Sequence, residues 1–191
     1  ASYRRQRQMC IRDRLMGLLK PISGEIIVDG VNLYNQNDPL QIFKWRLAIS
    51  HVPQNIYLSD SSFAENIAFG IPLNKIDLLR VENAANRARI DNFIRGTSNK
   101  FMTKVGENGI KLSGGERQRI GIARALYHNS KVIVFDEATS ALDDKTESEV
   151  ISSLNQLDKD LTIIIIAHRL STLKVCNRVL KFEGSIIEEL I

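Results

Sequence analysis

The chain has 191 residues, of which 43% are hydrophobic and 25% are charged, and this composition is typical of one folded domain rather than a disordered or fibrous protein. The net charge of +4 comes from residues 1–14, which hold five arginines and one aspartate, so the other 21 basic and 21 acidic residues balance. We therefore expect no basic face for DNA or RNA. Two cysteines are too few for a disulfide framework or a zinc site, and no apolar run reaches the roughly 18 residues of a membrane helix.

Residues 1–14 (ASYRRQRQMCIRDR) differ from everything that follows. They contain no apolar signal core and no clear hydrophobic period. We interpret them as a tail foreign to the domain, either disordered or an artefact of expression or sequence assembly, and an Arg-rich targeting peptide is the less favoured alternative. This tail is expected to pack against nothing.

From Leu15 onward the chain has the pattern of an α/β domain. The run LMGLLKP is expected to end a helix, and SGEIIVDG predicts a strand that closes in a turn at Asp29-Gly30. Leu47–Val52 predicts a second, buried strand that ends before Pro53 and Gln54. Residues 56–111 are more polar, and their best helical segments are residues 76–89 and 91–94.

The most informative stretch is Leu112–Asp143. Ser113 and Glu116 have the spacing of a capping box, which predicts that a helix begins here. Gly114 and Gly115 carry no side chains, so an anion could approach the free amide groups at the helix start. The helix is expected to bury Ile120, Ala123 and Leu126 on one face.

Two acidic residues follow the next predicted strand. Lys131–Phe135 is a short apolar run, as expected of a buried parallel strand, and Asp136 and Glu137 come directly after it. Adjacent acids at a strand end could simply be solvated. Open α/β sheets, however, bind ligands at the carboxyl ends of their strands, and the upstream LSGG favours a functional role.

The rest of the chain predicts a helix over residues 144–157, a strand over residues 161–167 and a pair of strands over residues 178–183 and 185–189. His168 directly follows the predicted strand, at the ligand edge of the sheet. His51 and His128 are expected to be structural.

Together, LSGGE, the apolar strand before Asp136-Glu137, and SALD resemble the signature motif, Walker B segment and D-loop of an ABC transporter nucleotide-binding domain. The run TKVGENG, with Glu107, resembles the X-loop of the exporter type. Glu116 departs from the commoner Gln, and both fit a capping box. The resemblance implies an α/β P-loop NTPase core (residues 15–56 and 130–191) with an inserted helical subdomain (residues 57–129).

The resemblance also implies roles for individual residues. Asp136 and Gln54 would hold Mg²⁺, Glu137 would be the general base, and His168 would contact the γ-phosphate and orient that base. The signature residues would bind the ATP held by a partner domain: Leu112, Ser113, Gly114, Gly115 and Glu116. The D-loop would comprise Ser140, Ala141, Leu142 and Asp143, and Glu107 would face the membrane domain.

A phosphate-binding Walker A loop is not found in the sequence. Gly109 and Gly114 have the right spacing, but Gly115 and Glu116 follow where Lys and Ser or Thr are required. We therefore expect that the domain is truncated before its first strands and its Walker A loop.

The implied function is ATP hydrolysis that powers export, with ATP and Mg²⁺ as cofactors, and the nearest subgroup is the bacterial flippases of lipid-linked oligosaccharides. The implied partners are a second nucleotide-binding domain and transmembrane domains, at the cytoplasmic face of the inner membrane. Two alternatives stay open: a soluble ABC-type ATPase acting on DNA or ribosomes, and an inactive fragment.

Overall fold

The centre of the molecule is a sheet of three parallel strands. The computed structural model describes all residues outside 1–9, 36–37, 137–146, 149, 152–153, 155–156, 158–159, 168, 184–185 and 191. The sheet has the order β3 (Ile49–Val52), β4 (Val132–Asp136) and β5 (Thr162–Ile166). Val52 lies opposite Phe135, and Asp136 lies opposite Ile166. The apolar, largely β-branched sequences of β4 and β5 suit a parallel sheet, and β4 in its centre is buried.

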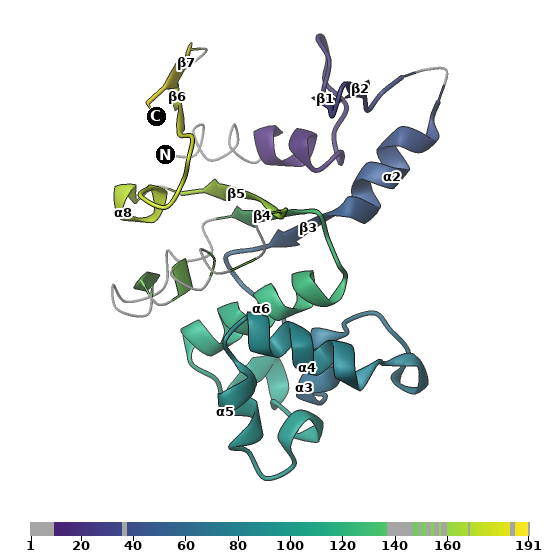
Figure 1. Cartoon of the computed structure of the whole chain (residues 1–191), viewed down its shortest axis with the longest axis vertical. Helices are drawn as coiled ribbons and strands as arrows, with labels where there is room; N and C mark the ends of the chain where they lie inside the picture. The colour runs from purple at the N-terminus through teal and green to yellow at the C-terminus, as the bar shows by residue number, and fades with distance from the viewer. Residues whose placement is uncertain are drawn as a thin grey trace.

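The chain between β3 and β4 is helical. These helices gather at one end of the molecule, below the sheet in Figure 1. Along the chain they are α3 (Phe63–Ile67), η1 (Leu73–Lys75), α4 (Leu78–Arg87), α5 (Asp91–Arg95), η2 (Lys100–Met102), η3 (Glu107–Gly109) and α6 (Gly114–Tyr127). The predicted helices over residues 76–89 and 91–94 correspond to α4 and α5.

One hydrophobic core joins the helices to the sheet. It contains Ile120 and Ala123 from α6, Val81 from α4, and Val52 and Phe135 from the strands. Helix α6 takes a central place in this core because nine of its 14 residues are buried. The α/β class predicted from the sequence is therefore confirmed.

Two hairpins lie at the other end of the molecule, beyond the sheet (Figure 1). The first pairs β1 (Ile27–Val28) with β2 (Val31–Asn32), and Asp29 and Gly30 between them have φ of 49° and 78°. Positive φ at both central residues is the signature of a type I′ turn, which agrees with the predicted turn. The second hairpin pairs β6 (Leu180–Glu183) with β7 (Ile186–Glu189).

The remaining described helical segments are short. Residues 10–15 are helical, and α2 (Leu40–Ala48) precedes β3. The described residues 147, 148, 150, 151 and 154 are helical, and α8 (Leu170–Leu173) follows β5. Helix α2 buries none of its residues. Leu40, Phe43 and Leu47 on it are each more than half exposed.

Two predicted boundaries are wrong. The strand predicted to start at Leu47 starts at Ile49, because Leu47 and Ala48 complete α2. Trp45 of α2 donates a hydrogen bond to the Leu15 carbonyl at 2.7 Å, a tertiary contact that local propensity does not reveal. The helix expected to extend through LMGLLKP stops at residue 15, and Gly17 then turns with φ of 72°.

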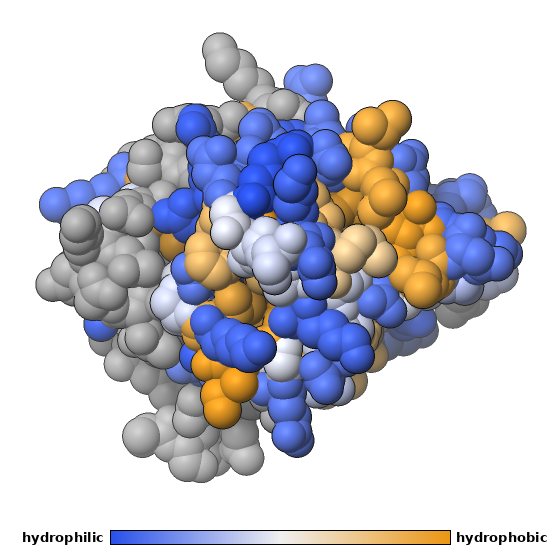
Figure 2. Space-filling model, turned by 90° about the horizontal axis from the view of Figure 1, so that it is seen from below, coloured by the Kyte–Doolittle hydropathy of each residue, from blue (hydrophilic) through white to orange (hydrophobic). Residues whose placement is uncertain are grey.

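The surface is mixed in character. The face at the helical end carries mainly hydrophilic side chains, with hydrophobic patches between them (Figure 2). Exposed apolar residues of this end include Leu73, Leu78 and Leu79. Among the described helices, none is long and apolar enough to cross a membrane.

The glycine loop before α6 offers a test of the packing. Gly109 has φ of 67°, and a Cβ added there would meet Leu58 Cδ1 at 2.6 Å. Gly70 has φ of 84°, but a Cβ there would meet no atom within 4 Å. We expect Gly70→Ala to lower the free energy of unfolding by about 1–2 kcal/mol, the cost of a left-handed backbone for an L-residue. Gly109→Ala should lower it further because Leu58 must also move.

Urea denaturation of the two variants measures this difference. Equal losses in the two variants would show that Leu58 is not tightly packed against the loop.

Candidate functional site

The parallel sheet brings the candidate residues to one edge. Gln54 lies two residues beyond Val52 at the end of β3, and Asp136 ends β4. Ala167 follows Ile166 at the end of β5. Because the strands are parallel and in register, the segments that follow them start at the same edge of the sheet. The predicted gathering of strand ends is confirmed at the level of the backbone.

Asp136 is the described carboxylate at this edge. Its Oδ2 atom accepts a hydrogen bond from the Arg12 guanidinium and lies 3.7 Å from His51 Nε2. The pKa of Asp136 lies below its usual range because the His51 ring, and then Arg12, favour the charged carboxylate more than partial burial disfavours it. Asp136 is therefore a carboxylate at neutral pH.

Arg12 and His51 were not assigned to the site from the sequence. The expectation that residues 1–14 pack against nothing is wrong for Arg12, which forms this ion pair with Asp136. Residues 10–15 form a helix that brings the guanidinium to the strand end. His51 was expected to be structural, but it lies beside Asp136, and its Nε2 is buried without a hydrogen-bond partner among the described residues. The strand register could have indicated this, since β3 and β4 are neighbours.

The donor chemistry at Asp136 fits Mg²⁺. This ion binds proteins through one or two carboxylates and keeps waters or phosphate oxygens as its other ligands. Among the residues that the structure describes, no three His, Cys, Asp or Glu side chains cluster as a complete metal cage. Asp136 thus suits an ion shared with a nucleotide, provided that Arg12 moves away from the carboxylate.

Gln54 is held by α6 through its backbone. Gln118 of α6 is 5% exposed, and its Nε2 donates a hydrogen bond to the Gln54 carbonyl at 2.9 Å. Gly121, one turn further along α6, approaches Ile56 so closely that a Cβ would meet Ile56 Cδ1 at 2.6 Å. These contacts fix the segment after β3 against the helix. The sequence analysis did not predict a role for Gln118.

A second contact from α6 secures the same segment further along. The Arg124 guanidinium donates to the Asn66 carbonyl at 3.0 Å and to the Tyr57 carbonyl at 3.1 Å, and it stacks over Phe69 at 4.5 Å. All the acceptors are backbone carbonyls. These contacts therefore depend on the backbone conformation of residues 54–69 and not on the side chains at the accepting positions. Helix α6 and this segment therefore form one packed unit.

The start of α6 has the predicted capping box. The Ser113 hydroxyl accepts from the Glu116 backbone at 3.3 Å, and the Glu116 carboxylate accepts from the Ser113 backbone at 2.7 Å. Ser113 is exposed, whereas Leu112 and Gly115 are buried. The exposed helix start faces outward, where a second molecule could reach it.

Glu107 lies in the glycine loop that precedes α6. It is exposed and begins η3, between Gly106 and Gly109, which both have positive φ. Val105 just before the loop donates to the Ser61 carbonyl at 3.0 Å. The loop is therefore anchored to the segment before α3, with Glu107 at its surface.

Several predicted site residues lie outside the described residues. They are Glu137, His168, Ser140, Ala141, Leu142 and Asp143. Their chain neighbours Asp136, which ends β4, and Arg169 are described.

Comparison with known proteins decides the family. A family model described as ABC transporter matches residues 11–140, which is more than half of the chain. This chain belongs to the ABC transporter family. The match includes residues 11–14 and therefore extends into the segment that holds Arg12.

Named relatives of this ABC transporter chain are flippases. The chain is 42% identical over 167 residues to the ATP-dependent lipid A-core flippase of Aliivibrio fischeri, and 38% identical over 170 residues to that of Cupriavidus metallidurans. These matches cover 87% and 88% of the chain. The chain spans 28% of the length of each of the two relatives.

A solved structure agrees. The chain matches a bacterial Atm1-family ABC exporter with ATP bound, with a TM-score of 0.76 and 37% sequence identity, over 90% of this chain and 29% of that one. The resemblance to an exporter-type ABC transporter domain is therefore confirmed, as is the P-loop NTPase fold that it implied.

The ion pair at Asp136 predicts a pH effect. Arg12→Gln removes one of the groups that favour the carboxylate, so the pKa of Asp136 should rise toward the ordinary value of about 3.9. A depressed carboxyl pKa stabilises the fold above the pKa of the unfolded chain, and this contribution is lost as the pH falls through the folded value. The variant should therefore lose less stability on acidification than the wild type.

Carbon-13 NMR titration of the Asp136 carboxyl measures the shift. The matched control is Arg14→Gln, because Arg14 contacts the Cys10 carbonyl and, among the residues that the structure describes, no carboxylate. An Asp136 pKa that is the same in both variants would contradict the ion pair.

Proposed function

We propose that this chain is part of the ATP-hydrolysing domain of an ABC exporter that flips an oligosaccharide-bearing lipid. The observation that carries the proposal is geometric: Asp136 ends β4 between the ends of β3 and β5, where α/β sheets bind nucleotides. The names of the flippase relatives support the lipid substrate class. Since the chain spans only part of those relatives, transport is proposed for the whole protein.

In the proposed site, Asp136 and Gln54 hold Mg²⁺. The ion would neutralise charge on the phosphates of ATP. Arg12 neutralises the same carboxylate in this structure and must leave it for the ion to bind. Glu137 is the general base and polarises the attacking water, since a carboxylate committed to a metal is a poor base. His168 contacts the γ-phosphate and orients Glu137.

The signature residues act on a nucleotide held by a partner domain. The exposed start of α6 supports this role, because Ser113 and the backbone at Gly115 offer hydrogen-bond donors and the positive end of a helix dipole. Leu112 is buried in the core and anchors the turn before α6. The capping box of Ser113 and Glu116 fixes the start of the helix. The D-loop, residues 140–143, reaches toward the same partner. The functional unit is thus a dimer.

Glu107 is the residue through which we propose that this domain couples to transmembrane domains. Its exposure on a loop anchored to the start of the helical part supports contact with the cytoplasmic loops of a membrane domain. We divide the domain into an ATPase core, residues 15–56 and 130–191, and a helical subdomain, residues 57–129. The proposed location is the cytoplasmic face of the inner membrane. No feature of the described residues favours the soluble ABC class, and the named relatives are flippases.

The general-base assignment predicts a separation of hydrolysis from binding. In the whole transporter, Glu137→Gln should lower kcat for ATP by about 10²- to 10⁴-fold, because it removes the base and keeps the size of the side chain. ATP affinity should change little. Steady-state hydrolysis and equilibrium ATP binding by the purified transporter measure the two effects.

The control is Lys75→Ala, an exposed change in η1 with no assigned role. Loss of ATP binding by a folded Glu137→Gln variant would refute the assignment. The 191-residue chain alone contains no Gly-x4-Gly-Lys-Ser/Thr run, so it should show negligible Mg²⁺-dependent turnover.

A further inference from the structure

Glu147 is a buried carboxylate that has no role in the proposed function. It lies in the helical stretch after β4 and is 4% exposed. Glutamate is almost never buried to this extent unless its charge is paired. The buried carboxylate therefore requires hydrogen-bond donors, and the donors show which segments of the chain Glu147 connects.

Among the described residues, Arg169 and Thr172 each donate to the Glu147 carboxylate, and they bind different oxygens. Arg169 Nη1 donates to Oε2 at 2.7 Å, and Thr172 Oγ1 donates to Oε1 at 2.5 Å. Hydrogen bonds to an ionised group are the strong ones. The bond from Thr172 is buried, whereas the Arg169 side chain is 42% exposed. We name these three residues the Glu147 clamp.

The clamp joins the segments that follow two neighbouring strands. Glu147 follows β4, whereas Arg169 and Thr172 follow β5. The two strands are paired up to Asp136 and Ile166, so both segments leave the same edge of the sheet. Arg169 directly follows residue 168 in the chain. The contact at Arg169 therefore ties the start of this segment to the helical stretch that contains Glu147.

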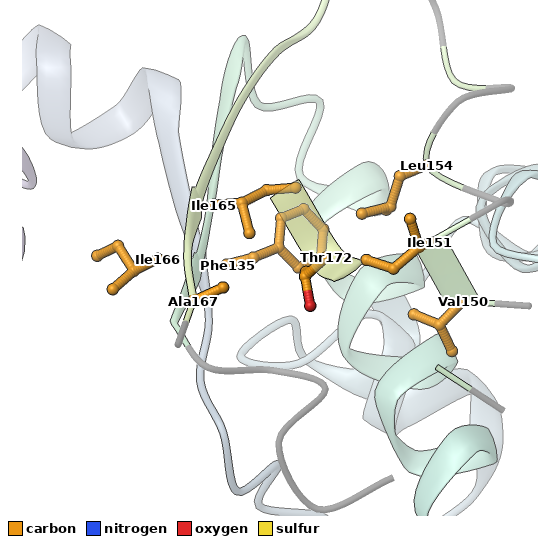
Figure 3. Close-up of a pocket in the computed structure, with 8 residues that line it drawn as sticks. All are labelled: Phe135, Val150, Ile151, Leu154, Ile165, Ile166, Ala167 and Thr172. Carbon is orange, nitrogen blue, oxygen red and sulfur yellow. The ribbon is translucent and has the colours of Figure 1, made fainter. Parts of the chain in front are cut away.

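The surroundings of Thr172 show that its hydroxyl serves the clamp. Thr172 is 3% exposed and lines a small pocket whose other residues are apolar, among them Phe135, Ile151 and Ile165. Figure 3 shows Thr172 among these apolar side chains, with its oxygen directed away from the Phe135 ring and Ile165. A valine would fill this pocket with the same shape and without a polar atom. Packing alone gives no reason for a hydroxyl at this position, whereas the hydrogen bond to Glu147 gives one.

We propose that Glu147 is a positioning residue: through Arg169 and Thr172 it fixes the segment that follows β5 relative to the edge of the sheet where Asp136 ends. The proposal rests on the proposed function, in which His168 orients the general base. The clamp would then act on the rate of hydrolysis without touching the nucleotide.

A pair of matched variants at Thr172 separates this role from simple packing. Thr172→Val keeps the shape and removes the donor, whereas Thr172→Ser keeps the donor and removes a methyl group. If the residue only packs, Val should be tolerated and Ser should be harmful. If the clamp positions the segment that follows β5, this segment should stay ordered in the Thr172→Ser variant and should lose order in the Thr172→Val variant.

Hydrogen exchange of the 191-residue chain tests the clamp directly. Thr172→Val and Glu147→Gln should each speed amide exchange in residues 167–173 by roughly tenfold or more, the change expected for a lost hydrogen bond to a charged group. Thr172→Ser should stay close to the wild type. Arg178→Gln, which breaks the exposed Arg178–Glu189 pair, is the control and should not affect this segment. Equal exchange in the Val and Ser variants would overturn the proposal.

Kinetics of the whole transporter test the functional consequence. Thr172→Val and Glu147→Gln should lower kcat for ATP by roughly tenfold or more with KM nearly unchanged, and Thr172→Ser should restore most of the rate. A rise in KM at unchanged kcat would overturn the positioning role. A wild-type transporter that hydrolyses no ATP would instead refute the proposed function, and the exchange experiment would still decide whether the clamp exists.

Discussion

The parallel pairing of β3, β4 and β5 is the constraint on which the rest of the structure depends. Parallel pairing places the three carboxyl ends at one edge, so residues that are up to about a hundred positions apart in the chain start from the same place. The four residues of β4 before Asp136 are all buried, so this strand is packed on both faces of the sheet, and a slip in its register would disturb the packing on each face. The buried isoleucine, valine and phenylalanine side chains of β4 therefore fix the position of Asp136.

The second determining contact runs between α6 and the segment that leaves β3. Gln118 holds the Gln54 carbonyl, Gly121 lets Ile56 approach, and Arg124 holds two further carbonyls. Because Ser113 caps the exposed start of α6, the segment at Gln54 and the signature residues are joined through one packed helix. The Gln118 Oε1 atom is buried without a hydrogen-bond partner among the described residues. The Nε2 atom of the same side chain donates the hydrogen bond to the Gln54 carbonyl.

Much of this architecture is predictable from the sequence, and particular residues show where prediction stops. The capping box at Ser113, the turn at Asp29-Gly30 and the strand ending at Asp136 depend on local chemistry, which a sequence displays. Arg12 at Asp136 could not be predicted, because its ion pair joins residues 124 positions apart. Glu147 could not be predicted either, since its burial depends on how the segments after β4 and β5 meet. The predicted start of β3 at Leu47 is wrong because α2 continues through Ala48, and its Trp45 bonds to the Leu15 carbonyl, a contact that the sequence does not display.

The central claim is that the exposed start of α6 binds a nucleotide held by a second ATPase domain. The most direct measurement is light scattering of this chain mixed with an intact ABC ATPase domain made deficient in hydrolysis at its own catalytic glutamate. The account predicts association that requires ATP, weakens with Ser113→Arg because a bulky side chain fills the phosphate position, and persists with Lys75→Ala. A folded, soluble chain that shows no ATP-dependent association, or one whose association is unaffected by Ser113→Arg, would contradict it.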